Sequence, residues 1–104
     1  MQLKDLVKIS SPKEVYRKFL ELGYDKYTDI YVSTRKDKKY MVIHPITNKK
    51  NHFGSTMEDY TKHKDNVRRN AFLKRNAKWD NSDKFSASTL STFLLWWSKY
   101  YIIL

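Results

Sequence analysis

The side chains of this sequence best suited to acid–base or metal chemistry are three histidines, His44, His52 and His63. Histidine metal sites commonly place two ligands four residues apart on a helix, and no such H-x₃-H pair occurs here. His44 and His52 come close if their segments pair as neighbouring strands, although histidines in such segments are more often ordinary strand residues. A nuclease or other metal-dependent enzyme that uses these histidines is therefore the least favoured hypothesis.

Other signatures of catalysis are missing from the sequence. The chain has no cysteine, which excludes a thiolate nucleophile, a cysteine zinc site and a disulfide framework. It also has no Gly-rich phosphate loop and no G-x-S-x-G motif. The adjacent acids Glu58 and Asp59 would point about 100° apart on a helix, so we expect them to satisfy a helix N-terminus or to pair with Lys62 and Arg69. We predict a non-enzymatic protein that has no catalytic residue, binds no metal and uses no cofactor.

Positive charge is concentrated in the middle of the chain. The formal net charge is +10 over 104 residues. Residues 33–78 contain thirteen Lys or Arg and four Asp or Glu, whereas residues 1–32 have a net charge of +1 and residues 79–104 a net charge of zero. This concentration favours a polyanionic partner, either nucleic acid or an acidic protein surface. The alternative is that an AT-rich coding sequence favours Lys and Asn for mutational reasons, which would leave the charge as a solvated surface.

The densest basic stretch is DYTKHKDNVRRNAFLKRN, residues 59–76. A helix over residues 64–76 would place Lys64, Arg68 and Arg75 within a sector about 40° wide, bordered by apolar residues. This ridge and the basic loops supply nine candidate ligands for a polyanion. They are Arg35, Lys36, Lys38, Lys39, Lys64, Arg68, Arg69, Lys74 and Arg75.

The elements that must position these residues begin with an N-terminal helix. The stretch SSPKEVYRKFLELGY predicts a helix over residues 12–22. Ser11 can cap it, Pro12 suits its first position, and Glu14 completes a capping box. Gly23 is expected to end it.

Two segments rich in β-branched and aromatic residues follow, over residues 27–34 and 39–44. A short third strand, NHFG, covers residues 51–54. Polar turns separate the three segments, so we predict a three-stranded antiparallel meander. The loops of this meander carry Arg35, Lys36, Lys38, Lys49 and Lys50 and lie at opposite ends of the sheet.

The stretch SASTLSTFLLWWSKYYIIL, residues 86–104, predicts a C-terminal helix that is apolar on two faces. A domain this small rarely covers so many large rings, so we expect the helix to be both a core element and a docking surface. Trp and Tyr are enriched in interface hot spots, which identifies the partner-binding candidates. They are Trp96, Trp97, Tyr100 and Tyr101. Truncation after Ser91 is then expected to abolish docking and to leave the sheet largely intact.

The fold class predicted from these elements is α+β, with a single domain over residues 1–104. It divides into residues 1–32 with the N-terminal helix and first strand, residues 33–97 as the basic core, and residues 98–104 as an apolar tail. The first ten residues lack the apolar core of a signal peptide. The most apolar run, residues 93–104, is shorter than the roughly 20 residues that a membrane-spanning helix needs.

Three stretches carry a family resemblance: STRKDKKYMV, HFGSTMEDYTKHKDNVRRNAFLKRNAKWD and SASTLSTFLLW. They fall within residues 33–97 and resemble an uncharacterised family of small basic proteins encoded by nucleocytoplasmic large DNA viruses of algae and protists. The pattern reads D-Y-T-x-H-K-D, then R-R-x-x-Y-L-x-R-H, then L-S-x-x-L-L-W, with Phe72 and Asn76 standing here in place of Tyr and His. The resemblance implies a viral origin and a small structural component of a large virus particle.

Two functional hypotheses stay open. The leading one is a virion component, a minor capsid or cement protein that docks on other capsid proteins through its aromatic helix and binds a polyanionic surface through its basic middle. The alternative is a sequence-nonspecific protein that binds double-stranded DNA and helps to condense the genome. Both place the protein in the virion, and in the host cytoplasm or virus factory during assembly.

Overall fold

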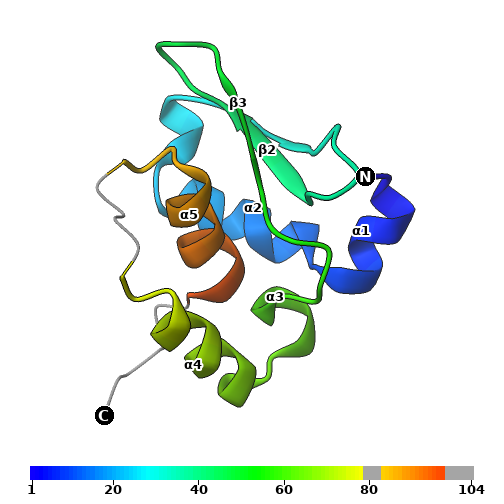
Figure 1. Cartoon of the computed structure of the whole chain (residues 1–104). Coiled ribbons are helices and arrows are strands. Elements are labelled where there is room, and N and C mark those ends of the chain that lie inside the picture. The colour runs from blue at the N-terminus through cyan, green and yellow to red at the C-terminus, as the bar shows by residue number, and fades with distance from the viewer. Residues whose placement is uncertain (79–82, 98–104) are drawn as a thin grey trace.

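The computed structural model describes residues 1–78 and 83–97 (Figure 1). Its helical elements are α1 (Leu3–Ile9), α2 (Pro12–Glu21), the 3₁₀ turn η1 (Tyr24–Lys26), α3 (Tyr60–His63), α4 (Asn66–Arg75), α5 (Ala87–Leu90) and the π-helix η2 (Ser91–Trp96). Its strands are β1 (Ile30–Val32), β2 (Tyr40–Ile43) and β3 (Lys50–Phe53). The α+β prediction is confirmed. None of the described helices has the length and apolarity that crossing a membrane requires.

The sheet is an antiparallel meander in the order β1-β2-β3, as the sequence predicts. Val42 of the central strand is fully buried. β1 is shorter than the strand predicted over residues 27–34. The reason lies in the preceding turn, because the backbone amides of Tyr27 and Thr28 both donate to the carbonyl of Tyr24 and hold that segment in a helical conformation.

α2 begins and ends where its local sequence predicts. The hydroxyl of Ser11 accepts a hydrogen bond from the backbone amide of Glu14 at 3.4 Å. Gly23 follows the helix with a left-handed φ of 79°, a conformation that side chains with a Cβ disfavour. Capping and termination are local interactions, so the sequence alone was sufficient to locate this helix.

α1 was not predicted from the sequence. It has no side-chain hydrogen bond at its N-cap, and Leu6 is its one buried residue. The charged amino group of Met1 donates to the carbonyls of Ser33 and Arg35, at 3.1 Å each. These long-range contacts hold α1 beside the β1–β2 turn.

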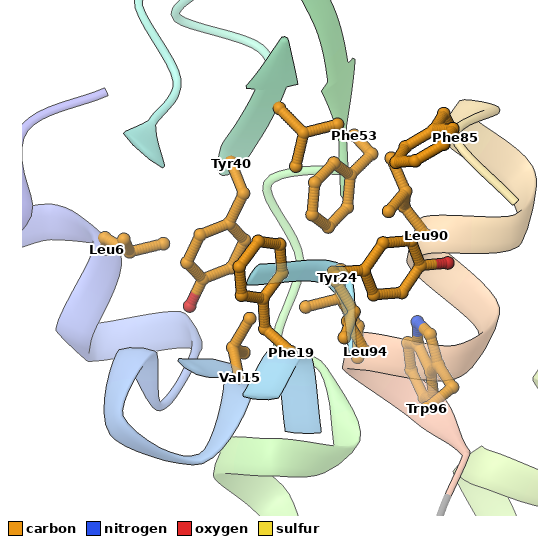
Figure 2. Packing of buried hydrophobic residues seen from close by; sticks show 12 residues of the cluster. Leu6, Val15, Phe19, Tyr24, Tyr40, Phe53, Phe85, Leu90, Leu94 and Trp96 are labelled. Carbon is orange, nitrogen blue, oxygen red and sulfur yellow. The ribbon is translucent and has the colours of Figure 1, made fainter. Parts of the chain in front are cut away.

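The core lies between the sheet, α2 and the α5–η2 segment. Figure 2 shows Tyr40 and Phe53 of the sheet pointing toward Phe19 of α2, with Leu90 and Leu94 beside them. The rings of Tyr40 and Phe53 stack with their centres 5.7 Å apart. Tyr40 and Phe53 are therefore core residues, whereas Tyr31 of β1 is exposed.

The C-terminal segment departs from the regular helix that was predicted. It continues from α5 as the π-helix η2, in which the amide of Trp97 donates to the carbonyl of Thr92, five residues back, at 2.7 Å. The wider turn changes which side chains face the core, so that Leu95 and Trp96 are buried while Trp97 is partly buried. Truncation after Ser91 would therefore remove core residues, which contradicts the expectation that the sheet survives it.

A buried ion pair joins the start of β2 to the start of α3. Lys39 Nζ lies 3.1 Å from Asp59 Oδ2, and the two side chains are 1% and 0% exposed. Burial lowers the pKa of Lys39, and the negative charge of Asp59 opposes that shift. The other carboxylate oxygen of Asp59 caps α3 by accepting hydrogen bonds from the amide and the hydroxyl of Thr61. Lys39 is thus a structural residue, which corrects its prediction as a polyanion ligand.

Hydroxyl groups connect the α1–α2 junction to this ion pair. The hydroxyl of Ser10 is 2.7 Å from the hydroxyl of Tyr40 and 3.2 Å from that of Thr61. The backbone amide of Ser11 donates to the same Thr61 hydroxyl at 2.9 Å. Three segments that are distant in sequence therefore meet in one polar network inside the protein.

Replacing Lys39 by Met should lower the free energy of unfolding by about 3–5 kcal/mol, because the buried carboxylate of Asp59 loses its cation. Urea unfolding followed by circular dichroism measures the loss. Lys36→Met, on the exposed turn nearby, is the matched control and should change stability by less than about 0.5 kcal/mol. Equal stability of Lys39→Met and the wild type would show that the ion pair is not needed for the fold.

Candidate polyanion-binding site

The nine predicted polyanion ligands do not form one surface. Lys39 and Arg69 are buried, and Lys64 lies beside α2. The other six reach the surface: Arg35, Lys36, Lys38, Arg68, Lys74 and Arg75.

Lys64 lies outside α4, which corrects the predicted ridge of Lys64, Arg68 and Arg75. It ends α3 with a left-handed φ of 56°. The helix cannot continue through it because Asp65 caps α4, where its carboxylate accepts hydrogen bonds from the amides of the first turn, including that of Arg68 at 3.2 Å. The side chain of Lys64 forms an ion pair with Glu14 of α2 instead.

Arg69 lies on the inner flank of α4 and is 7% exposed. Its guanidinium carbon is 4.3 Å from the centre of the Tyr60 ring, a cation–π contact. So little of Arg69 is open to solvent that it is unsuited to contact a phosphate of an extended polymer. This burial corrects its prediction as a polyanion ligand.

Arg68 and Arg75 share the opposite flank of α4. They line a groove of about 420 Å³ whose wall includes Trp96. Arg68 Nη1 lies 3.5 Å from a carboxylate oxygen of Glu58, and Arg68 Nε lies 3.7 Å from one of Asp65. These ion pairs are long and solvated, so they hold Arg68 only weakly.

The β1–β2 turn brings another cation toward this flank. Lys38 lines a groove of about 300 Å³ together with Phe72 and Trp96, and Trp96 also lines the groove of Arg68. Arg35 in the same turn forms a bidentate pair with Asp37, at 3.1 and 2.8 Å. Of the six predicted ligands that reach the surface, four take part in no ion pair within residues 1–78 and 83–97: Lys36, Lys38, Lys74 and Arg75.

We call these four residues and Arg68 the outer basic surface. Lys74 is exposed on α4 itself, next to Arg75. The β2–β3 turn with Lys49 and Lys50 lies at the other end of the molecule from α4 (Figure 1), so these two lysines are not part of the surface.

The predicted partner-binding aromatic residues differ in how deeply they are buried. Trp96 is 5% exposed and stacks on Phe72 of α4 with ring centres 4.3 Å apart, so it is a core residue and not a docking anchor. Trp97 is partly buried, and its carbonyl accepts a hydrogen bond from Lys18. Tyr100 and Tyr101, like Trp79 and the tail over residues 98–104, lie outside the described residues.

The three histidines lie on separate segments. His44 Nδ1 accepts hydrogen bonds from the amides of the β2–β3 turn, and His52 Nδ1 lies 2.8 Å from the hydroxyl of Ser33. The ring of His63 packs against that of Trp96, and desolvation is the main cause that lowers its pKa. Among the described residues no cluster of three or more His, Asp or Glu has the arrangement of a metal site.

A further groove lies on the inner flank of α4, and no sequence pattern indicated it. It has a volume of about 440 Å³ and is lined by α2, α3, α4 and the end of η2. We call it the inner groove. Its charged walls are Glu14, Arg17, Lys18, Glu21, Lys64 and Arg69, and its aromatic walls are Tyr60, Phe93 and Trp97. These walls come from three distant parts of the chain, so only folding brings them together.

Lys18 is the most perturbed cation of the inner groove. Its Nζ donates to the carbonyl of Trp97 at 2.7 Å. Burial, followed by the positive charge of Lys64, lowers the pKa of Lys18 to about 8, against the opposing charges of Glu14 and Asp59. At neutral pH a charged ammonium group therefore faces an uncharged hydrogen-bond partner.

Residues 28–76 match the model of a family of unknown function (DUF5754). The matched segment begins just before β1 and ends just after α4, so it contains the whole outer basic surface. Lys18 and Trp97 of the inner groove lie outside it. Neither the comparison with curated proteins nor the comparison with solved structures yields a match.

The two neighbouring tryptophans should respond differently to truncation. Trp96→Ala should lower the free energy of unfolding by about 3–5 kcal/mol, because it removes a buried ring from the core. Trp97→Ala should cost clearly less, since Trp97 is only partly buried. Urea unfolding of both variants measures the difference, and equal losses would contradict the core position of Trp96.

Lys18 should make folding stability depend on pH. Its pKa is about 8 in the folded protein against an ordinary value of 10.5, so the unfolded chain binds more protons between about pH 8 and 10.5. The free energy of unfolding of the wild type should therefore rise relative to that of Lys18→Met as the pH increases through this range. Urea unfolding at several pH values tests this, and a constant difference between the two proteins would contradict the lowered pKa.

Proposed function

We propose that this protein is a non-enzymatic nucleic-acid-binding protein that grips the phosphate backbone of double-stranded DNA through the outer basic surface. The observation that carries the proposal is a group of surface cations on α4 and the β1–β2 turn that, within the described residues, take part in no ion pair or only in long, solvated ones. Such cations gain most from a phosphate, since they give up no strong internal partner on binding.

The chemistry of these residues favours backbone contact over base reading. Two of the five are arginines, which bind phosphate oxygens in a bidentate manner, and three are lysines, which act as mobile point charges. Phosphate contacts orient a protein on the duplex but carry no sequence information. Binding is thus proposed to be indifferent to sequence, as genome condensation requires.

The resemblance to proteins of large DNA viruses supports the virion as the location of this DNA binding. We propose that the protein belongs to the virion, where it would contact the packaged genome, and that it is made in the host cytoplasm or the virus factory. The match over residues 28–76 to a family of unknown function neither adds to this setting nor argues against it.

A minor capsid or cement role is the second candidate, and a different surface favours it. Tyr16 and Leu20 of α2 and Leu3 and Val7 of α1 are large apolar residues that remain exposed. They could dock on another capsid protein in place of the C-terminal aromatic residues. Tyr16→Ser with Leu20→Ser should then reduce incorporation into virus particles without changing DNA binding, and unchanged incorporation would remove this candidate.

DNA binding through the outer basic surface predicts a steep dependence on salt. Five neutralised phosphates correspond to a slope of log K against log salt of about −4 to −5 for duplex DNA. The triple variant Arg68→Gln, Lys74→Gln, Arg75→Gln should lower the magnitude of the slope to about 2, because three contacts are lost. Fluorescence anisotropy of a labelled duplex over a salt series measures both values.

The matched control is Lys4→Gln, Lys13→Gln, Lys26→Gln, which removes the same charge from exposed positions on α1, α2 and η1. It should keep a slope close to that of the wild type. If both triple variants lose affinity equally, the net charge alone is responsible and the outer basic surface is not the site. If the wild type shows no salt dependence, duplex DNA is not the ligand.

A further inference from the structure

The inner groove combines positive charge with an aromatic wall in a volume that suits a small ligand. Its volume of about 440 Å³ falls within the roughly 300–1,000 Å³ usual for small-molecule sites. We propose that the inner groove binds a nucleotide, with the phosphate between Lys18 and Lys64 and the base against Trp97. This site goes beyond the proposed duplex binding and lies on the other flank of α4, so either proposal can fail alone.

The charges of the groove leave room for an anion. Four cations and two carboxylates line it. The carboxylates already have partners, since Glu21 pairs with Arg17 at 3.0 Å and Glu14 pairs with Lys64. The ammonium group of Lys18 donates to a carbonyl oxygen, which carries no full negative charge. A phosphate would supply the missing charge through short, charge-assisted hydrogen bonds.

Lys18 and Lys64 approach from opposite walls, α2 and the α3–α4 junction. The positive charge of Lys64 disfavours the charged form of Lys18, so the two ammonium groups repel each other across the groove. A dianionic phosphate between them would convert this repulsion into two attractions. The arrangement is thus better suited to a phosphate than to a neutral ligand.

The aromatic wall indicates that the ligand also has a flat ring. Phe93 and Trp97 pack edge to face, with ring centres 6.0 Å apart, and both rings are partly buried at the groove. Nucleobases stack on such rings with little dependence on the base, because every base has a π-face. Inorganic phosphate would leave this wall unused, and a nucleoside would leave the cations unused.

Two unusual backbone features position these walls. Lys64 adopts a left-handed φ of 56°, which is uncommon for a residue with a long side chain and turns it toward Glu14. The π-helix η2 is the second feature, and π-turns are rare and frequent at functional sites. Its C-cap is Trp97, whose carbonyl oxygen lies 2.7 Å from Lys18 Nζ. Each feature is a less common backbone conformation than a regular α-helix, and each lies at a wall of the groove.

The proposal has a pH signature. A bound phosphate would raise the pKa of Lys18 from about 8, so binding would take up a proton above that pH and affinity would fall as the pH rises further. Below about pH 8 the affinity should be constant for as long as the phosphate is dianionic. The charged groups that face Lys18 are Glu14, Arg17, Glu21, Asp59, Lys64 and Arg69.

Isothermal titration calorimetry of the full chain with adenosine monophosphate and thymidine monophosphate tests the site, with adenosine and inorganic phosphate as partial ligands. Both nucleotides should bind at least about tenfold more tightly than either partial ligand, since two walls contribute. Lys18→Gln with Lys64→Gln should weaken nucleotide binding by about tenfold or more. Lys4→Gln with Lys26→Gln, which removes equal charge elsewhere, should change it less than about twofold.

The ligand could be a free nucleotide or a nucleotide within a nucleic-acid strand, and binding of a single-stranded oligonucleotide with a 5′ phosphate distinguishes the two. Tighter binding than the mononucleotide identifies a nucleotide within a strand, and equal or weaker binding identifies a free nucleotide. Duplex binding by Lys18→Gln with Lys64→Gln should persist, which distinguishes failure of this site from failure of the proposed function.

A second measurement does not depend on these variants folding. Nuclear magnetic resonance titration of the Lys18 amine in the wild type should show its pKa rising when adenosine monophosphate is added. Nucleotides that bind no better than inorganic phosphate, or a Lys18 pKa that does not move at saturation, would overturn the proposal.

Discussion

The buried ion pair between Lys39 and Asp59 is the interaction on which the rest of the structure depends. Two charges this deep persist only as a pair, because either one alone would have lost its solvation without compensation. The pair holds the start of β2 against the start of α3, and Ser10 adds the α1–α2 junction through its hydroxyl. Gly54 lies next to Lys39 and has a φ of 85°. A Cβ added at Gly54 would be 2.8 Å from the side chain of Leu95, which shows that η2 packs directly on the end of β3.

This arrangement determines where the positive charge of the protein can act. The net charge of +10 counts every cation equally. Lys39, however, is buried in an ion pair with Asp59, and Arg69 packs on the ring of Tyr60, so neither is open to a partner at the outer surface. α4 lies between two groups of cations, those of the outer basic surface and those of the inner groove, which differ in their exposure to solvent. The outer basic surface is solvated and therefore suits salt-sensitive contact with a polymer. The inner groove is partly desolvated, so its cations interact more strongly with a small anion placed among them.

Sequence patterns succeeded where an element is defined by its nearest neighbours in the chain. The capping box at Ser11 and the alternation of the strand segments predicted α2 and the meander correctly. They failed where two local signals compete or where a distant contact decides. Asp65 was a stronger helix start than the basic run before it, which placed Lys64 outside α4. α1 depends on contacts of Met1 with a turn more than thirty residues away.

The α+β class, the order of the main elements and the concentration of charge over residues 33–78 could all be predicted from the amino-acid sequence, because periodicity, capping and turn chemistry act over a few residues. Which cations are buried, which face solvent and which line a groove depends on how the chain packs. Lys39 and Lys38 are adjacent in the chain, yet one is a core ion-pair partner and the other a surface residue. The physical reason is that burial and ion pairing depend on contacts between segments that are distant in the chain. Residue type and spacing along the chain do not specify those contacts.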